Sequence, residues 1–233
     1  MRLIRRVVAF ALVVVGVATV APGEGRAEGF APDAYYRLRM DLFAATPLAA
    51  GDIVFLGDSI TEGAEWNELF PGLPVRDRGI SGDTTAGVLA RLGMVTASRP
   101  AAVFLLVGTN ELASAPDPAP GLARQREIIA RIRRESPDTR VFVQSLLPRA
   151  AAYRERIESY NDALRGICRE AGVVFIDLYP AFLASDGSLR DELTFDELHL
   201  NGAGYRRWQE LLRPYVQAVG PASAGHGDRQ NSP

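Results

Sequence analysis

The sequence has no lysine, one cysteine and two histidines, and each shortage excludes a kind of chemistry. Without lysine, the chain cannot form a Schiff base, use a serine–lysine pair, or hold phosphates with the lysine of a phosphate-binding loop. Cys168 has no second cysteine with which to form an intrachain disulfide or a cysteine metal site. Its place on the apolar face of an expected helix favours a role in core packing.

The scarcity of histidine narrows the choice of a general base to one residue. His226 lies in a stretch rich in glycine, serine and proline, residues 220–233, which we expect to be a disordered tail. If the chemistry needs an imidazole, His199 is the only serious candidate.

Residues 1–27 have the pattern of a secretory signal peptide. Three arginines within the first six residues precede an apolar stretch over residues 7–20, and Gly25-Arg26-Ala27 offers small residues for cleavage. We therefore expect export to the periplasm or the medium, with retention of the segment as an anchor as the alternative. The apolar part is short for a membrane span, so we expect no stable membrane insertion after cleavage.

The rest of the chain has the size and composition of one folded domain, which we assign to residues 28–219. Residues 28–233 carry 22 arginines and 27 acidic residues, a formal charge of −5. An acidic chain of this kind is a poor ligand for nucleic acid, so we expect no nucleic-acid partner. Nothing in the pattern indicates an oligomeric state.

Continuous apolar runs alternate with helical patterns, which predicts a parallel sheet covered by helices on both faces. The expected strands are residues 52–56, 74–80, 103–107, 141–145 and 173–176, and the clearest amphipathic helix is 153–169. Residues 114–121 are rich in proline and are expected to form a loop. Right-handed crossovers then give an α/β fold, a three-layer α/β/α sandwich with five parallel strands, whose ligands bind beyond the carboxyl ends of the strands.

Five chemically useful residues follow the ends of these strands. Ser59 follows the first strand, Gly82 the second and Asn110 the third, while Asp196 and His199 lie in the loop after the fifth. His199 would accept the proton of Ser59, and Asp196 would bind the other ring nitrogen. The backbone N–H groups of Ser59 and Gly82 and the amide of Asn110 would stabilise an oxyanion. The pattern therefore indicates acyl transfer to a serine.

Each of these residues also has a purely structural interpretation. Ser59 could cap the helix that follows it, and Gly82 could be a turn glycine. Asn110 could brace its loop, and Asp196 and His199 could serve only to hold the last loop. The convergence of all five at one edge of the sheet favours the catalytic interpretation.

Four short segments resemble the sequence blocks of the SGNH or GDSL hydrolases. Gly57-Asp58-Ser59 resembles the first block, Ser81-Gly82-Asp83-Thr84 the second, Gly108-Thr109-Asn110 the third, and Asp196-Glu197-Leu198-His199 the last. The resemblance implies a flavodoxin-like sandwich, a Ser59–His199–Asp196 triad, an oxyanion hole from Ser59, Gly82 and Asn110, and no cofactor. No metal site is expected, because His199 has no neighbouring histidine or cysteine ligand.

Within that family, residues 78–85, 146–149 and 198–200 resemble the platelet-activating-factor acetylhydrolase-like branch and bacterial carbohydrate O-acetylesterases. Both imply short acyl groups, acetyl above all, carried by a glycan or a small polar molecule. A lysophospholipase, arylesterase or thioesterase is the first alternative, and a non-catalytic binding protein is the second. Asp77 and Glu111 stand where asparagine and aspartate are common in this branch. Arg78 and Arg149 could line the substrate cleft or brace loops.

Overall fold

The computed structural model describes residues 31–115 and 117–219, so the predicted signal segment and the predicted tail with His226 lie outside the described residues. One five-stranded sheet, all parallel, has the order β2-β1-β3-β4-β5. The strands are β1 (Ile53–Gly57), β2 (Val75–Gly79), β3 (Ala102–Leu106), β4 (Arg140–Gln144) and β5 (Val174–Ile176). The predicted α/β class and five-stranded parallel sheet are confirmed.

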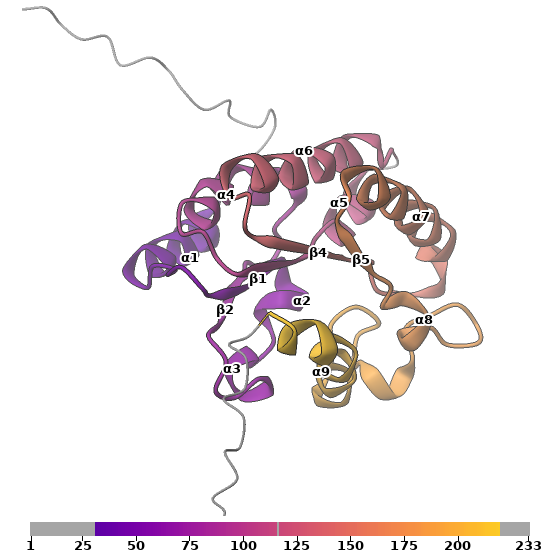
Figure 1. The fold of residues 1–233 in the computed structure, drawn as a ribbon. Helices are drawn as coiled ribbons and strands as arrows, with labels where there is room; N and C mark the ends of the chain where they lie inside the picture. The colour runs from indigo at the N-terminus through magenta and orange to yellow at the C-terminus, as the bar shows by residue number, and fades with distance from the viewer. Residues whose placement is uncertain (1–30, 116, 220–233) are drawn as a thin grey trace, which may run out of the picture.

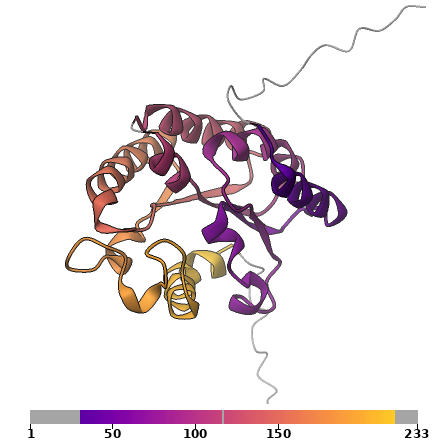
Figure 2. The same ribbon diagram turned by 180° about the vertical axis from the view of Figure 1, so that it is seen from behind.

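Two layers of helices cover the two faces of the sheet (Figure 1) and remain separate when the molecule is seen from behind (Figure 2). Because neighbouring residues of a strand point to opposite faces, Val54 and Leu56 enter one core while Ile53 and Phe55 enter the other. The first core is closed by α4 (Thr85–Thr96), α6 (Ala119–Glu135) and α7 (Arg154–Ala171). The second is closed mainly by α3 (Trp66–Leu69), α8 (Tyr179–Phe182) and α9 (Gly202–Gln217).

Helix α1 (Ala34–Ala45) lies against β2 and the start of α4. Its Arg39 side chain forms an ion pair with Asp77 at 3.1 Å, and the Tyr36 hydroxyl donates to the Gly87 carbonyl at 3.0 Å. The remaining short elements are α2 (Ser59–Glu62), α5 (Thr109–Ser114) and the 3₁₀ turns η1 (Ala151–Tyr153) and η2 (Asp191–Leu193).

The predicted loop over residues 114–121 is wrong at both ends. Residue Ser114 is the last residue of α5, and α6 already begins at Ala119. Pro120 lies in the first turn of α6, where a backbone N–H has no partner within the helix. Proline therefore fits the start of this helix and does not exclude it.

An aromatic stack fixes the segment that follows β1. The Trp66 ring lies parallel to the Phe55 ring at a centroid distance of 3.6 Å, and the Trp66 side chain is almost completely buried. Its indole N–H donates to the Thr61 carbonyl at 2.9 Å. Trp66 is thus a core residue that holds α2 against the sheet.

The part of the chain that the structure describes contains no helix long and apolar enough to cross a membrane. Over the same residues, no group of three or more His, Cys, Asp or Glu side chains could hold a metal ion. Cys168, on the inner face of α7, is completely buried in the core, as expected, and this burial raises the pKa of its thiol to about 11.

Candidate active site

Ser59 stands immediately beyond the carboxyl end of β1, as the first residue of α2. The cap of this helix is Asp58, whose Oδ1 accepts the N–H of Ile60 at 3.0 Å. The structural alternative for Ser59, capping α2, is therefore wrong. The serine hydroxyl is half-buried and has a different partner.

That partner is the imidazole of His199, 140 residues away in the sequence. The distance from His199 Nε2 to Ser59 Oγ is 3.1 Å, and the distance from His199 Nδ1 to Asp196 Oδ2 is 2.7 Å. A carboxylate can only accept, so Nδ1 carries the proton and Nε2 has a free lone pair for the serine O–H. The structure thus brings Ser59, His199 and Asp196 together in the order that a general base requires.

The loop that carries Asp196 and His199 is folded around the Asp196 carboxylate. Its Oδ1 accepts the backbone N–H of His199 at 2.7 Å and that of Leu198 at 3.1 Å. The Thr194 hydroxyl donates to the His199 carbonyl at 2.7 Å. A carboxylate that binds the backbone two and three residues ahead places the third side chain within its own reach. This explains the Asp-x-x-His spacing.

The same contacts keep the carboxylate ionised. The hydrogen bond from the His199 side chain, followed by those from the His199 and Leu198 backbone, lowers the pKa of Asp196 to about 2. At neutral pH Asp196 therefore carries the negative charge that favours an imidazolium beside it.

The predicted oxyanion donors gather at the carboxyl ends of three neighbouring strands. Gly82 lies in the turn after β2, with a φ of 77° that suits glycine. The Asn110 side chain, in the first turn of α5, donates to the Asp83 carbonyl at 2.8 Å, which brings its amide to the residue beside Gly82. One Nδ2 hydrogen makes that bond and the second remains for another acceptor. Ser59 supplies its backbone N–H at the start of α2.

Two glutamates that sequence analysis did not select hold these turns in place. Glu62 Oε2 accepts the backbone N–H of Ser81 at 2.6 Å and its hydroxyl at 2.7 Å. Glu111 Oε1 accepts the backbone N–H of Thr85 at 2.6 Å and also its hydroxyl. The only sequence signal for Glu62 is its place three residues after Ser59. Glu111 directly follows Asn110 and stands where aspartate is common in the branch that the sequence resembles.

The two arginines whose roles the sequence left open both brace loops. Arg78 is buried and donates to the carbonyls of Asp77 and Thr46, both at 2.6 Å. Arg149 is half-buried, donates to the Thr109 carbonyl at 3.1 Å and lies over the Tyr153 ring. Arg78 therefore ties β2 to the segment after α1, and Arg149 supports the residue before Asn110.

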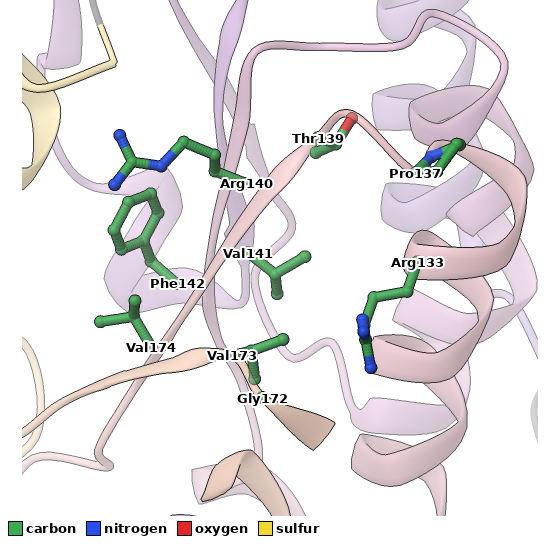
Figure 3. Close-up of a pocket in the computed structure, with 9 residues that line it drawn as sticks. All are labelled: Arg133, Pro137, Thr139, Arg140, Val141, Phe142, Gly172, Val173 and Val174. Carbon is green, nitrogen blue, oxygen red and sulfur yellow. The ribbon is translucent and has the colours of Figure 1, made fainter. Parts of the chain in front are cut away.

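The candidate site is open to solvent. The side chains of His199 and Asp196 are 45% and 52% exposed, and the neighbouring Phe195 is 94% exposed. A hollow of about 210 Å³ lies elsewhere, at the amino ends of β4 and β5, where Arg133 and Arg140 flank valines and Phe142 (Figure 3). In a parallel sheet that is the edge opposite the serine, so the hollow does not belong to this site.

Comparison with known proteins agrees with the geometry. The sequence model of the GDSL-like Lipase/Acylhydrolase family matches residues 55–207. The platelet-activating factor acetylhydrolase IB subunit alpha2 of Homo sapiens is 32% identical over 178 residues, which cover 72% of this chain and 77% of that protein.

Solved structures of similar fold include a GDSL-like lipase from Bacteroides thetaiotaomicron VPI-5482, with a TM-score of 0.69 and 24% identity over 78% of this chain and 97% of that one. They also include Axe2, an acetylxylan esterase from Geobacillus stearothermophilus, with a TM-score of 0.54 and 19% identity over 72% and 95% of the two chains. At these identities the likeness shows the shared fold.

Proposed function

This chain belongs to the GDSL-like lipase/acylhydrolase family, and we propose that it is a serine esterase that removes short acyl groups, acetyl above all, from carbohydrate or similar polar alcohols. The observation that carries the proposal is the hydrogen-bonded triad of Ser59, His199 and Asp196. His199 Nε2 lies 3.1 Å from Ser59 Oγ, and His199 Nδ1 lies 2.7 Å from Asp196 Oδ2. A serine hydroxyl becomes a useful nucleophile only when a held base can take its proton.

The reaction follows from the positions of these groups. As Ser59 Oγ attacks the ester carbonyl carbon, His199 Nε2 accepts the serine proton, and the negative charge moves to the former carbonyl oxygen. The N–H groups of Ser59, Gly82 and Asn110 stabilise that oxygen. His199 then gives the proton to the leaving alcohol, and an acyl group remains on Ser59. Water, deprotonated by the same imidazole, releases the acid and restores the serine.

The open rim supports a small acyl group on a large polar alcohol. About half of each of the His199 and Asp196 side chains faces solvent, so a polysaccharide or glycan can approach without entering a deep pocket. The relatives named as an acetylhydrolase and an acetylxylan esterase support the choice of acetyl.

One observation favours a second candidate, a lysophospholipase or related lipid esterase. Phe195 precedes Asp196 and exposes 94% of its surface, which would suit contact with an acyl chain or a lipid surface. Rates on p-nitrophenyl esters of increasing chain length separate the two candidates. A maximum at acetate supports the acetylesterase, and a maximum at long chains supports the lipid esterase.

The decisive experiment compares Ser59→Ala with Ser98→Ala on p-nitrophenyl acetate. We expect Ser59→Ala to lower kcat by about 10⁴-fold or more, because the nucleophile is lost. Ser98 lies beyond the end of α4, where its hydroxyl donates to the Val95 carbonyl, so Ser98→Ala should keep the wild-type rate. Retained turnover in Ser59→Ala would refute the esterase assignment. Failure of a fluorophosphonate probe to label Ser59 would favour a non-catalytic binding protein.

Export is part of the proposal and depends on residues 1–27. We propose that the protein acts outside the cytoplasm, on a glycan or small-molecule ester and without a nucleic-acid partner. Cell fractionation and the mass of the recovered protein provide the test. A full-length product confined to the cytoplasm would contradict it.

A further inference from the structure

Helix α4 carries a charged residue in a place where the helix faces the core. Arg91 lies on the same side of α4 as Val88 and Val95, three residues before it and four after it, and both valines are fully buried. The Arg91 side chain is itself 0% exposed. Burial of a guanidinium is costly unless it meets a charge and several acceptors, so its partners are informative.

Arg91 has two hydrogen-bond partners, and both belong to the segments that form the candidate site. Its Nε donates to Asp83 Oδ2 at 2.9 Å, and its Nη2 donates to the Gly57 carbonyl at 3.0 Å. Gly57 is the last residue of β1, two residues before Ser59. Asp83 directly follows Gly82.

The segment that carries Asn110, the third proposed donor, is connected to Arg91 through Asp83. The backbone carbonyl of Asp83 accepts the Asn110 amide at 2.8 Å, while its carboxylate accepts Arg91. The segments that carry the Ser59, Gly82 and Asn110 donors are therefore linked by hydrogen bonds through one guanidinium and one aspartate. Among residues 31–115 and 117–219, no other side chain forms hydrogen bonds to both Gly57 and Asp83.

We propose that Arg91 is a positioning residue of the oxyanion hole, which holds the end of β1 and the turn after β2 at the separation that the three donors need. This inference rests on the proposed esterase function. The planar fork of a guanidinium binds two acceptors at a fixed separation and angle, whereas the three donors of an ammonium group share one nitrogen and rotate freely, so they do not impose that separation. Donors aimed at a developing charge lose much of their effect when they are misplaced by about 1 Å.

A role in fold stability alone explains these contacts less well. Replacing a buried ion pair by apolar side chains is often neutral or stabilising, so burial of the pair is weak evidence for a stabilising role. Arg91 Nη1 is also buried without a hydrogen-bond partner. The network is thus not optimised to satisfy the guanidinium, but it does join the segments that carry the donors.

The test is Arg91→Lys, with Arg78→Lys as the matched control. Both arginines are buried, both lie over the Phe43 ring, and both donate to backbone carbonyls. Arg78 donates to the carbonyls of Asp77 and Thr46, and neither of these residues carries or adjoins one of the three donors. We expect Arg91→Lys to lower kcat for p-nitrophenyl acetate by about 10–100-fold with KM within about twofold, less than the 10²–10³ cost of deleting a donor. Arg78→Lys should keep kcat within about twofold.

A second measurement separates positioning from a general loss of structure. Phenylboronic acid forms a tetrahedral adduct with an active serine, so its affinity for Arg91→Lys should fall by the same factor as kcat/KM, while circular dichroism and the Tm match those of Arg78→Lys. A kcat for Arg91→Lys equal to that of the control, or an unchanged boronate affinity, overturns the inference.

A double variant and the activity of the wild-type protein keep the result interpretable. If Arg91→Lys does not fold, the neutral double variant Arg91→Gln/Asp83→Asn removes both buried charges together, and wild-type kcat in that variant would equally overturn the inference. Absence of ester hydrolysis in the wild-type protein would instead remove the proposed function. The two failures are therefore distinguishable.

Discussion

At the scale of single residues, Asp196 has two roles that a substitution can separate. Its Oδ1 folds the loop by accepting two backbone N–H groups, and its Oδ2 accepts from the His199 ring. An asparagine can keep the first role through its amide oxygen. It cannot keep the second, because an NH₂ group facing Nδ1 favours the wrong imidazole tautomer.

We therefore expect Asp196→Asn to fold normally and to lower kcat by about 10⁴-fold. The pKa of Asp196 is about 2 because of its His199 hydrogen bond, so the wild-type carboxylate stays ionised above about pH 4. The two proteins are therefore compared at pH 8, where the Asp196 carboxylate is ionised. Steady-state rates at this pH provide the measurement. Asp191→Asn, in the exposed turn η2, is the control, and a wild-type kcat in Asp196→Asn would contradict the assigned role.

The sequence predicts the five candidate site residues but not the side chains that support them, and the reason is physical. Ser59, Gly82, Asn110, Asp196 and His199 could be selected because each follows a strand or shares a short motif. Most contacts of the supporting groups span long separations, such as 26 residues between Glu111 and Thr85 and 34 between Arg91 and Gly57. No local sequence pattern predicts such pairs. An arginine on the buried face of α4 does, however, indicate that a buried partner exists for it.

At the scale of secondary structure, the order of the strands assembles the site. Strand β1 lies between β2 and β3, and Gly57 is paired with Gly79 on one side and with Leu106 on the other. A Cβ on Gly57 would lie 2.2 Å from the Leu106 carbonyl oxygen, and one on Gly79 would lie 2.3 Å from the Glu62 nitrogen. Glycine at both positions lets α2 lie close against the strand ends.

The sequence predicts each strand to within one residue at either end. Strands β1 and β3 are continuous apolar runs, as is typical of buried parallel strands, whereas β2 is mostly polar. The prediction of a loop over the start of α6 is wrong, because proline, although a loop signal elsewhere, is tolerated in the first turn of a helix. The strand ends, next to which the site residues lie, are thus easier to predict from the sequence than the start of a helix in a proline-rich segment.

The turn after β2 allows a clean test of backbone orientation. Gly82 and Gly72 have φ values of 77° and 78°, and a Cβ on either would meet no atom within 4 Å. Alanine should therefore cost about 1–2 kcal/mol of backbone strain at each position, with no steric clash. Gly72 precedes β2, at the opposite edge of the sheet from the serine.

We expect Gly82→Ala and Gly72→Ala to lower the Tm by similar amounts and only Gly82→Ala to lower kcat, by about 10-fold or more, because the Gly82 N–H is one of the proposed oxyanion donors. Thermal denaturation and p-nitrophenyl acetate kinetics on both variants provide the comparison. Equal kcat values in the two variants would count against Gly82 as a donor.

At the scale of the whole molecule, buried carboxyl groups couple folding to pH. Burial, with smaller contributions from the nearby carboxylates of Asp83 and Glu111, raises the pKa of Asp58 to about 7, although the hydrogen bond from the Ile60 N–H acts against it. Burial is also the main cause that raises the pKa of Asp77 to about 6, although the Gly79 N–H and Arg39 act against it. Both groups have an ordinary pKa of 3.8. The folded protein therefore binds more protons than the unfolded chain between about pH 4 and pH 7.

Because the folded state holds the extra protons, the free energy of unfolding falls as pH rises through this range. Asp58 alone should lower it by about 2–3 kcal/mol between pH 5 and pH 8. Asp58→Asn removes that titration, and its amide oxygen can still accept the Ile60 N–H that caps α2. Urea unfolding at both pH values should show a smaller pH dependence in Asp58→Asn than in the wild type, while the exposed-site control Asp138→Asn keeps the wild-type dependence. An undiminished dependence in Asp58→Asn would place the titrating protons elsewhere.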